Sequence, residues 1–226
     1  MTTFTDKTIV VIGASGVFGG LITHALRNAG ADVRLIVRTP SNLDISLQDL
    51  PVATASIGDR ADLEAAFAEV TLGRPVDGII NCAGVVAFGS FADLSDRVAR
   101  DLFTTNALGT INVISLATHG VNPEGFLASF TGVAADMAIV GMGAYCASKV
   151  AAKTAMAVAT RELRAKKIIV LDIRAPHTET GLVERALEGA APKMPQGLTP
   201  EAVVARVLEA LANGEKDLPA DAFPSA

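Results

Sequence analysis

The chain has 226 residues, half of them apolar, and its 24 acidic and 19 basic side chains give a net charge of −5. This size is typical of one globular domain, and the even spread of charge argues against a surface for nucleic acid or anionic membrane. There is no tryptophan, and Tyr145 is the only tyrosine. The core must therefore be mainly aliphatic, and the lone phenol calls for an explanation.

Apolar runs of strand type alternate with segments of helical periodicity along the chain. In chain order we predict a strand at 8–12, a helix at 16–28, strands at 33–37 and 52–57, a helix at 63–70, a strand at 78–81, a helix at 102–119, a strand at 125–130, a helix at 144–165, a strand at 168–173 and a helix at 200–211. Such βαβ units have right-handed crossovers, so they predict an α/β fold with a doubly wound parallel sheet and helices on both faces.

No linker divides the chain, which predicts one domain over residues 1–226. Residues 181–197 contain two prolines and three glycines and are predicted to be a flexible flap on the substrate side. Residues 217–226 contain two prolines with little periodicity, which indicates a tail or an edge segment.

The N-terminus and the cysteines indicate a cytoplasmic location. Residues 1–7 lead into an apolar run of about five residues, which is too short for a signal peptide. No apolar run reaches the roughly 18 residues that a membrane span needs. Cys82 and Cys146 lie far apart without metal-ligand spacing. We expect reduced thiols, with metal binding or a disulfide as the alternatives.

A glycine-rich turn, GASGVFG, joins the first predicted strand to the first predicted helix. Glycines three residues apart allow a tight turn and let phosphate oxygens approach amide groups at a helix N-terminus. This position predicts a dinucleotide site, the alternative being a tight turn without a ligand. The predicted cofactor-binding residues are Gly13, Ser15, Gly16, Val17, Phe18 and Gly19.

The second predicted strand ends on Arg38 rather than on an acid. An acidic residue here would bond the ribose hydroxyls of NAD, whereas a guanidinium matches the additional phosphate of NADP. Arg38 therefore favours NADP over NAD, unless it is simply a solvated arginine after a strand.

Tyr145 and Lys149 are four residues apart at the start of the helix predicted at 144–165, so both lie on one face, one turn apart. A phenol has a pKa near 10, and lowering it by roughly three units needs about 4 kcal/mol of preferential stabilisation of the phenolate. The Lys149 ammonium, helped by an oxidised nicotinamide ring, has the right charge. The pair predicts an acid–base site, although such a spacing can also mark an ordinary helix face.

Taken in order, these motifs resemble those of the short-chain dehydrogenases/reductases over about residues 8–212. Further marks are the segment 81–84, which reads NCAG where the family has NNAG, Asn106 in the next helix and Pro176 after the sixth strand. The resemblance implies a Rossmann-type, three-layer αβα domain. It also implies further cofactor-binding residues, namely Asp59 beside the adenine, Asn81, Ala83, Gly84, Asn106, Tyr145, Lys149, Pro176, Thr178 and Thr180.

The resemblance gives the catalytic residues their roles. Tyr145 would donate or accept the proton, Lys149 would lower its pKa and bind the nicotinamide ribose, and Asn106 would hold a water that links Lys149 to solvent. Thr178 or Thr180 would bind the carboxamide. No residue pattern indicates a metal ligand.

The chain also departs from the family pattern. Ile12 and Val17 occupy a threonine and a glycine position of the usual phosphate turn, so the glycine spacing is closer to that of extended and atypical members. Gly132 stands where relatives carry the serine that orients the substrate carbonyl. Of the nearby hydroxyls on Ser129 and Thr131, we predict that Thr131 takes this role.

Two other positions have two interpretations each. Asp59 can contact adenine or cap a helix. His177, which replaces the family's glycine after Pro176, can face the substrate or be a plain loop residue. The short segment after Pro176 indicates an open pocket, which a partner subunit could complete. We expect a homodimer through the two long helices, with a tetramer as the alternative.

The function predicted from these residues is an NADP(H)-dependent carbonyl reductase or alcohol dehydrogenase acting on a small molecule. One alternative is an NAD(P)-binding sensor or regulatory protein with little catalysis, which the missing serine favours. Another is an epimerase or dehydratase, which the glycine spacing favours. The aromatic-poor composition indicates an aliphatic pocket, while fold and cofactor chemistry do not identify the substrate.

Overall fold

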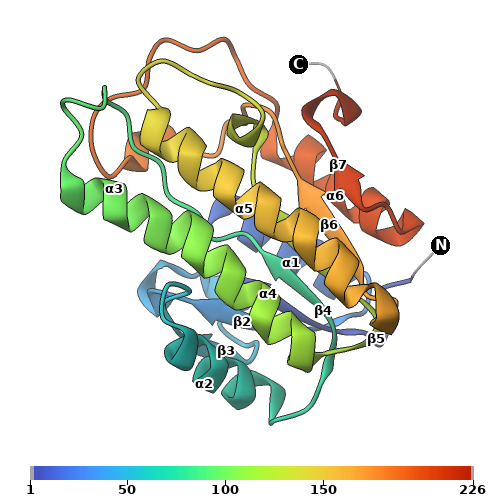
Figure 1. The fold of residues 1–226 in the computed structure, drawn as a ribbon. Helices are drawn as coiled ribbons and strands as arrows, with labels where there is room; N and C mark the ends of the chain where they lie inside the picture. Colours follow the sequence, from blue (N-terminus) through green and yellow to red (C-terminus); the bar gives the residue numbers. More distant parts are fainter. Residues whose placement is uncertain (1–2, 225–226) are drawn as a thin grey trace.

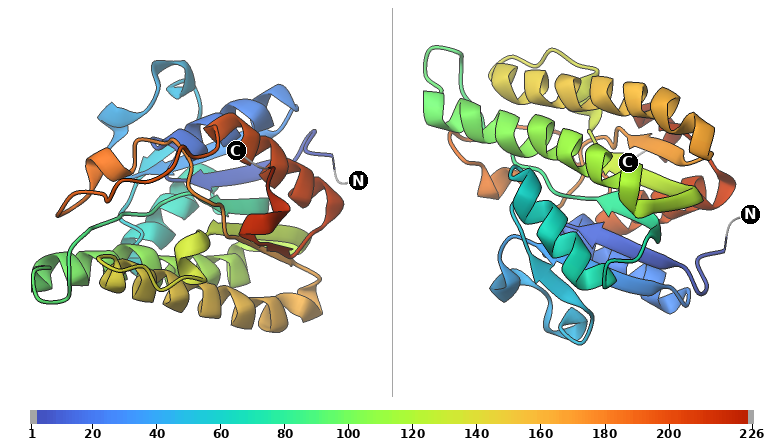
Figure 2. Two further views of the ribbon diagram at one scale, coloured as in Figure 1. Left: turned by 90° about the horizontal axis from the view of Figure 1, so that it is seen from above. Right: turned by 60° about the horizontal axis from the view of Figure 1, so that its bottom comes forward.

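The structure, a computed structural model, describes residues 3–224 and contains one parallel sheet between two layers of helices (Figures 1 and 2). Its strands lie in the order β3-β2-β1-β4-β5-β6-β7. The strands are β1 (Thr8–Ile12), β2 (Asp32–Val37), β3 (Val52–Thr54), β4 (Val76–Asn81), β5 (Val121–Phe130), β6 (Ile169–Ile173) and β7 (Asp217–Leu218). The helices are α1 (Val17–Asn28), α2 (Arg60–Thr71), α3 (Asp96–Leu102), α4 (Gly109–Gly120), α5 (Gly143–Glu162) and α6 (Pro200–Asn213). The predicted doubly wound αβα architecture is confirmed.

Alternating side chains of the strands build a core on each face of the sheet. In β1, Ile9 and Val11 belong to the cluster under α1 and α6, whereas Val10 and Ile12 belong to the cluster under α2, α4 and α5. Figure 2 shows these helical layers on opposite sides of the sheet. Both faces of a central parallel strand are buried, which explains its unbroken apolar sequence.

The third helix begins earlier than the sequence pattern predicts. It runs from Asp96 through α3, continues as a π-helical segment at Phe103–Leu108, and enters α4, whereas the prediction was 102–119. The early turns carry mostly charged residues, and of α3 only Val98 and Leu102 are buried. Apolar periodicity is therefore absent there, and the start is set by Ser95, whose hydroxyl accepts a hydrogen bond from the Val98 amide.

Several strand ends also differ from the prediction. β3 ends at Thr54 rather than at residue 57, while β4 and β5 begin earlier, at Val76 and Val121. β5 includes Pro123, a strand breaker, and its pairing with β4 shifts register between Val76 and Gly78.

The C-terminal segment contributes an edge strand rather than a tail. β7 pairs parallel with β6, and Phe223 beyond it is buried against the cluster under α1 and α6. Among residues 3–224, no helix has both the length and the apolarity required to cross a bilayer.

Candidate active site

The glycine turn after β1 forms one wall of a cavity of about 530 Å³ at the carboxyl end of the sheet. Gly13 has a φ of +83°, and a Cβ there would lie 2.8 Å from the Ala83 backbone nitrogen. A Cβ on Gly19 would collide with the carbonyl oxygen of Gly13. Both positions therefore require glycine, because the turn and the start of α1 pack directly against backbone.

The same cavity has a cation and hydroxyl groups at its outer end. Arg38 and Thr39 follow β2, Asn42 lies in the short turn after them, and Ser56 follows β3. Arg38 is exposed, and no described carboxylate is within ion-pair distance of its guanidinium. The open glycine turn, the N-terminus of α1 and this free cation fit the phosphates of a dinucleotide.

A second cavity, of about 510 Å³, adjoins the first and contains Tyr145 and Lys149. Most of its lining is apolar. Phe18 and Phe130 stack on its wall with ring centroids 4.7 Å apart and an interplanar angle of 14°. The loop after β6 contributes Pro176, Thr178 and Thr180, all of which the sequence predicted to bind cofactor.

Tyr145 and Lys149 are buried together on the first turns of α5. The Lys149 Nζ lies 5.9 Å from the centre of the Tyr145 ring and donates a hydrogen bond to the Phe130 carbonyl oxygen at 3.0 Å. Burial lowers the pKa of Lys149 to about 8, partly opposed by the negative charge of Asp172. Burial also raises the pKa of the Tyr145 phenol above its usual value. Both side chains therefore favour their neutral forms more than they would in water.

The chain matches the family model described as short chain dehydrogenase over residues 7–190. It belongs to the short-chain dehydrogenase family. Bovine L-xylulose reductase is 30% identical over 166 residues, which cover 71% of this chain and 67% of that protein. The 3-ketodihydrosphingosine reductase TSC10 of Yarrowia lipolytica is 27% identical, and the match spans 66% of this chain but only 45% of the relative.

Solved structures of short-chain dehydrogenases have the same fold. One from Burkholderia cenocepacia in complex with NADP has a TM-score of 0.83 at 21% identity, covering 99% of this chain and 90% of that one. One from Burkholderia phymatum in complex with NAD has a TM-score of 0.84 at 18% identity, covering 97% and 90%. The described fold of this short-chain dehydrogenase is therefore that of dinucleotide-bound relatives.

Asn106 lies in the π-helical segment behind the site and lines neither cavity. Its side-chain amide donates to the Val85 carbonyl at 2.9 Å and to the Ser148 hydroxyl at 3.0 Å, and its oxygen accepts from the Val85 amide at 3.0 Å. Asn106 thus joins the loop after β4 to α5. The water predicted to link it with Lys149 stays a prediction.

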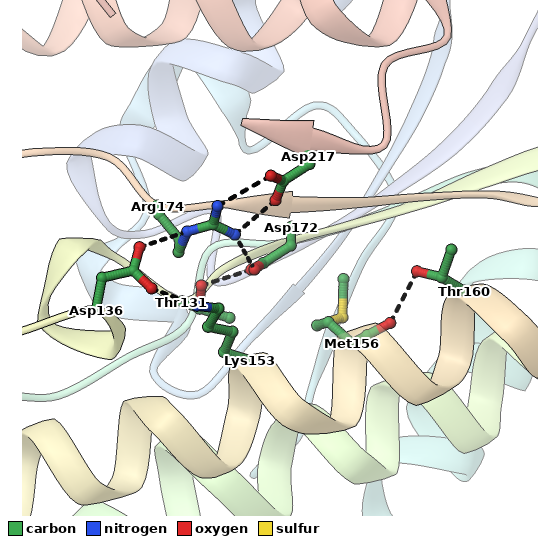
Figure 3. A network of polar contacts seen from close by, with 8 residues as sticks. All are labelled: Thr131, Asp136, Lys153, Met156, Thr160, Asp172, Arg174 and Asp217. Atoms are coloured by element: carbon green, nitrogen blue, oxygen red, sulfur yellow. Dashed lines mark hydrogen bonds and ion pairs between the residues drawn. The ribbon is translucent and has the colours of Figure 1, made fainter. Parts of the chain in front are cut away.

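Thr131 does not face the substrate cavity, which corrects the role predicted for it. The residue is fully buried, and its hydroxyl donates to the Asp172 carboxylate at 2.5 Å. Figure 3 shows Thr131 within a network in which the Arg174 guanidinium contacts Asp172 and Asp217. The hydroxyl is thus held by a charged network around Arg174, which reaches Lys153 of α5 through Asp136.

Gly132, the position of the family serine, lines the cavity with a φ of +79° and a ψ of 159°. A Cβ would meet open space there, but L side chains rarely adopt this backbone conformation. The hydroxyl groups on the cavity wall belong instead to Tyr145, Thr178 and Thr180.

Asp59 also differs from its predicted cofactor role. Its carboxylate accepts a hydrogen bond from the Asp62 amide at 3.1 Å and caps α2, and the residue does not line the first cavity. Ser56 and Ile57 line that part instead. The capping interpretation of Asp59 is the one that the structure supports.

The NCAG segment after β4 forms the floor between the two cavities. Cys82, Ala83 and Gly84 line both of them. Asn81 lines neither, but its oxygen accepts from the Ala83 amide at 3.1 Å and its nitrogen donates to Ser129 at 3.1 Å. Asn81 therefore shapes the turn and leaves the cavity walls to its neighbours. Both cysteines are free thiols.

The flap, residues 181–197, is tied to the rest of the site at its base and its middle. Leu198 and Thr178 form a bridge at the base, and the Leu187 amide donates to the Val86 carbonyl at 2.9 Å. The Glu188 carboxylate accepts two hydrogen bonds from Ser95, from its amide at 2.8 Å and from its hydroxyl at 2.5 Å. The flexibility predicted for the flap stays a prediction.

His177, for which the sequence left two interpretations, lines the second cavity. The sequence reasoning missed Arg185, which lies on the flap and lines both cavities. Met137, Met142 and Met194 line the second cavity as well. No local motif marks Arg185 or the three methionines, because loops that are distant in sequence bring them to the site.

Proposed function

We propose that this short-chain dehydrogenase is an NADP(H)-dependent oxidoreductase that interconverts a carbonyl and an alcohol. The observation that carries the proposal is the buried Tyr145–Lys149 pair in the wall of one cavity, directly beside a second cavity built on the glycine turn. A bound nicotinamide would supply or accept the hydride. The protein's own task is then to orient the carbonyl and move one proton.

Tyr145 is the group proposed to move that proton. In the reducing direction the neutral phenol, which burial favours, donates to the carbonyl oxygen. In the oxidising direction Tyr145 must act as a base, so positive charge has to stabilise its phenolate. Lys149, one helical turn away, is the cation in place to do so.

The cofactor preference is proposed on Arg38. Its exposed guanidinium lines the first cavity beside Thr39 and Asn42, where a 2′-phosphate would find bidentate donors. NADPH should therefore bind more tightly than NADH in a calorimetric titration, and Arg38→Gln should reduce this difference. Tighter binding of NADH by the wild type would contradict the proposed preference.

The substrate class is proposed on the lining of the second cavity. Beyond Tyr145, its walls are made mostly by apolar side chains, including Val133, Ile139, Met142 and Leu182. Methionine side chains adapt to different shapes, which suits more than one apolar substrate. We therefore expect apolar ketones or aldehydes to be reduced faster than polyhydroxylated ones.

Replacement of Tyr145 by Phe tests the proposed mechanism. The variant keeps the buried ring but loses the hydroxyl, so reduction of an apolar carbonyl panel by NADPH should slow by about a hundredfold to ten-thousandfold. NADPH affinity should stay within about twofold of the wild type, because the hydroxyl is proposed to act on the substrate. A Tyr145→Phe enzyme with wild-type turnover would end this mechanism.

A cofactor-binding sensor with little catalysis is the second candidate. Two observations favour it, namely Gly132 at the serine position and the charged network that holds the Thr131 hydroxyl. A relative from Xanthobacter autotrophicus, 29% identical over 135 residues, is named inactive 2-(S)-hydroxypropyl-CoM dehydrogenase 2. Carbonyl-dependent oxidation of NADPH above an enzyme-free blank would exclude this candidate.

We further infer a homodimer in the cytoplasm. Apolar side chains are exposed along the continuous helix of α3 and α4 and along α5, including Leu108, Ile111, Val150 and Val158. A two-fold axis across these neighbouring helices would cover them.

The proposed cytoplasmic location has a separate basis. Two free thiols in the chain support a reducing compartment.

A further inference from the structure

The two cavities of the site share a narrow set of lining residues. These are Gly16, Cys82, Ala83, Gly84 and Arg185. The first four come from the glycine turn and the NCAG turn, which form the floor. Arg185 comes from the flap and is the charged residue among the five. The junction between the cavities therefore has the N-terminus of α1 on one side and a guanidinium on the other.

The guanidinium of Arg185 is held in place but not neutralised. Its Nε donates to the Gly181 carbonyl at 2.9 Å and one Nη donates to the Thr180 carbonyl at 3.1 Å. Both partners are backbone oxygens at the base of the flap. Within residues 3–224, no carboxylate lies within 4.0 Å of this guanidinium, whereas the next arginine along the chain, Arg206, pairs with Glu215. Arg185 thus keeps a full positive charge and free donors at the junction.

We propose that Arg185 binds the pyrophosphate of the dinucleotide and thereby ties the flap to the cofactor. The inference rests on the proposed function, since it assumes a dinucleotide that fills both cavities. Such a ligand has its adenosine in the cavity of Arg38 and its nicotinamide beside Tyr145, so its pyrophosphate crosses the junction. The free amides of the first turn of α1 meet the phosphates on one side of the junction, and the Arg185 guanidinium meets them on the other.

This contact has a consequence for the substrate side of the site. The flap also carries Leu182 and Val183, which line the second cavity and pack in the same apolar cluster as Tyr145. A phosphate bound to Arg185 holds that part of the flap over the cavity. Cofactor binding therefore completes the apolar wall that the substrate meets.

Arg185→Gln tests the contact, with Lys193→Gln as the matched control. Both changes remove one positive charge from an exposed position on the flap, but Lys193 lines neither cavity. Each variant is titrated with NADPH, with 2′-phospho-ADP-ribose, which keeps the pyrophosphate but lacks nicotinamide, and with 2′-AMP, which lacks the pyrophosphate. Thermal melting checks that the variants are folded.

Arg185→Gln should weaken binding of NADPH and of 2′-phospho-ADP-ribose by about tenfold, the lower range for a hydrogen bond to a charged group. Binding of 2′-AMP should not change, and Lys193→Gln should bind all three ligands like the wild type. In hydrogen exchange, 2′-phospho-ADP-ribose should protect residues 181–187 of the wild type but not of Arg185→Gln.

Other results would overturn the proposal in distinguishable ways. Unchanged affinity of Arg185→Gln for 2′-phospho-ADP-ribose, or an equal loss for 2′-AMP, would refute the contact while leaving the proposed function intact. An equal loss of affinity in Lys193→Gln would show that the general positive charge of the flap, and not a contact of Arg185, is responsible, which would also refute the contact. A wild-type protein that binds neither NADPH nor NADH would refute the proposed function itself.

Discussion

Burial acts on Tyr145 and Lys149 against the charged form of each side chain. For Tyr145 it raises the pKa and keeps the phenol protonated, whereas for Lys149 it lowers the pKa to about 8 and makes the ammonium easier to deprotonate. The Lys149 charge is nevertheless present at neutral pH, where a proton donor or base at Tyr145 would need it. Burying the Lys149 ammonium beside the phenol therefore lowers the stability of the fold.

Lys149 should give the protein a measurable stability change at alkaline pH. Its folded-state pKa of about 8 lies below the ordinary value of 10.5, so between these values the unfolded chain binds more protons here than the folded chain. Stability from this residue is therefore constant below pH 8 and rises from pH 8 to 10.5. Relative to Lys149→Met, the wild type should gain up to about 3 kcal/mol over this window.

Urea unfolding of both proteins at pH 7 and at pH 10.5 measures this difference. Lys193→Met, at an exposed position, is the control and should follow the wild type at both pH values. If the free-energy difference between wild type and Lys149→Met were the same at pH 7 and pH 10.5, burial would not destabilise the Lys149 ammonium and the prediction would be wrong.

Thr131 has the hydroxyl that the predicted role requires, but its side chain does not face the substrate cavity. The sequence placed a hydroxyl near the family's serine position, but side chains at the end of a strand alternate between faces. The Thr131 side chain points to Asp172, whereas the backbone of Gly132 lines the cavity. One residue of difference therefore moves the hydroxyl from the substrate to a charged network, in which Arg174 also meets Asp136.

At the level of elements, the turn from β1 to α1 depends on how closely backbone approaches backbone. A Cβ on Gly19 would overlap the Gly13 carbonyl, whereas a Cβ on Gly16 would lie 3.4 Å from the same oxygen. Gly16 also has an ordinary φ of −88°. Gly16 and Gly19 look alike in the sequence, but packing requires a glycine only at position 19.

Gly19→Ala and Gly16→Ala should therefore differ in stability. Gly19→Ala forces α1 away from the turn and should lower the free energy of unfolding by about 2 kcal/mol or more. Gly16→Ala should change it by less than about 1 kcal/mol, because the added methyl group can be accommodated. Urea unfolding of the two variants without cofactor makes the comparison. Equal destabilisation would contradict the packing argument.

The helix from α3 to α4 shows why periodicity missed an element's start. Its first turns are stabilised by pairs four residues apart, Arg97 with Asp101 and Arg100 with Asp96, and not by an apolar face. The π-helical segment then places Asn106 toward the loop after β4. Neither feature has an apolar signature, while the cap at Ser95 could have been found.

For the whole molecule, α4 and α5 lie side by side on one face of the sheet (Figure 1). The exposed apolar side chains on these helices predict association. The wild type should sediment as twice the chain mass of 23.2 kDa. Ile111→Glu places a charge within the proposed interface and should shift the protein to the monomer mass, because an unpaired charge is costly to bury. Analytical ultracentrifugation at several concentrations measures both.

Ile45→Glu is the control for this shift. Ile45 is 83% exposed on the loop after β2, away from α4 and α5, so its substitution should not change the sedimenting mass. A wild type that stays monomeric at all concentrations would show that the protein does not form the proposed dimer. A dimer that persists in Ile111→Glu would show that the interface lies elsewhere.

The fold class, the glycine turn and the spacing of Tyr145 and Lys149 can all be predicted from the amino-acid sequence. Each depends on local rules, namely apolar periodicity, the conformations open to glycine and the spacing of one helical turn, all of which can be read within a few residues. The packed fold is needed to see that Thr131 donates to Asp172, that Asp59 caps α2 and that Arg185 lines both cavities. These outcomes depend on which partners meet across loops and strands that are distant in sequence. Packing and charge pairing compete there for each polar group, and the local sequence does not show which of them prevails.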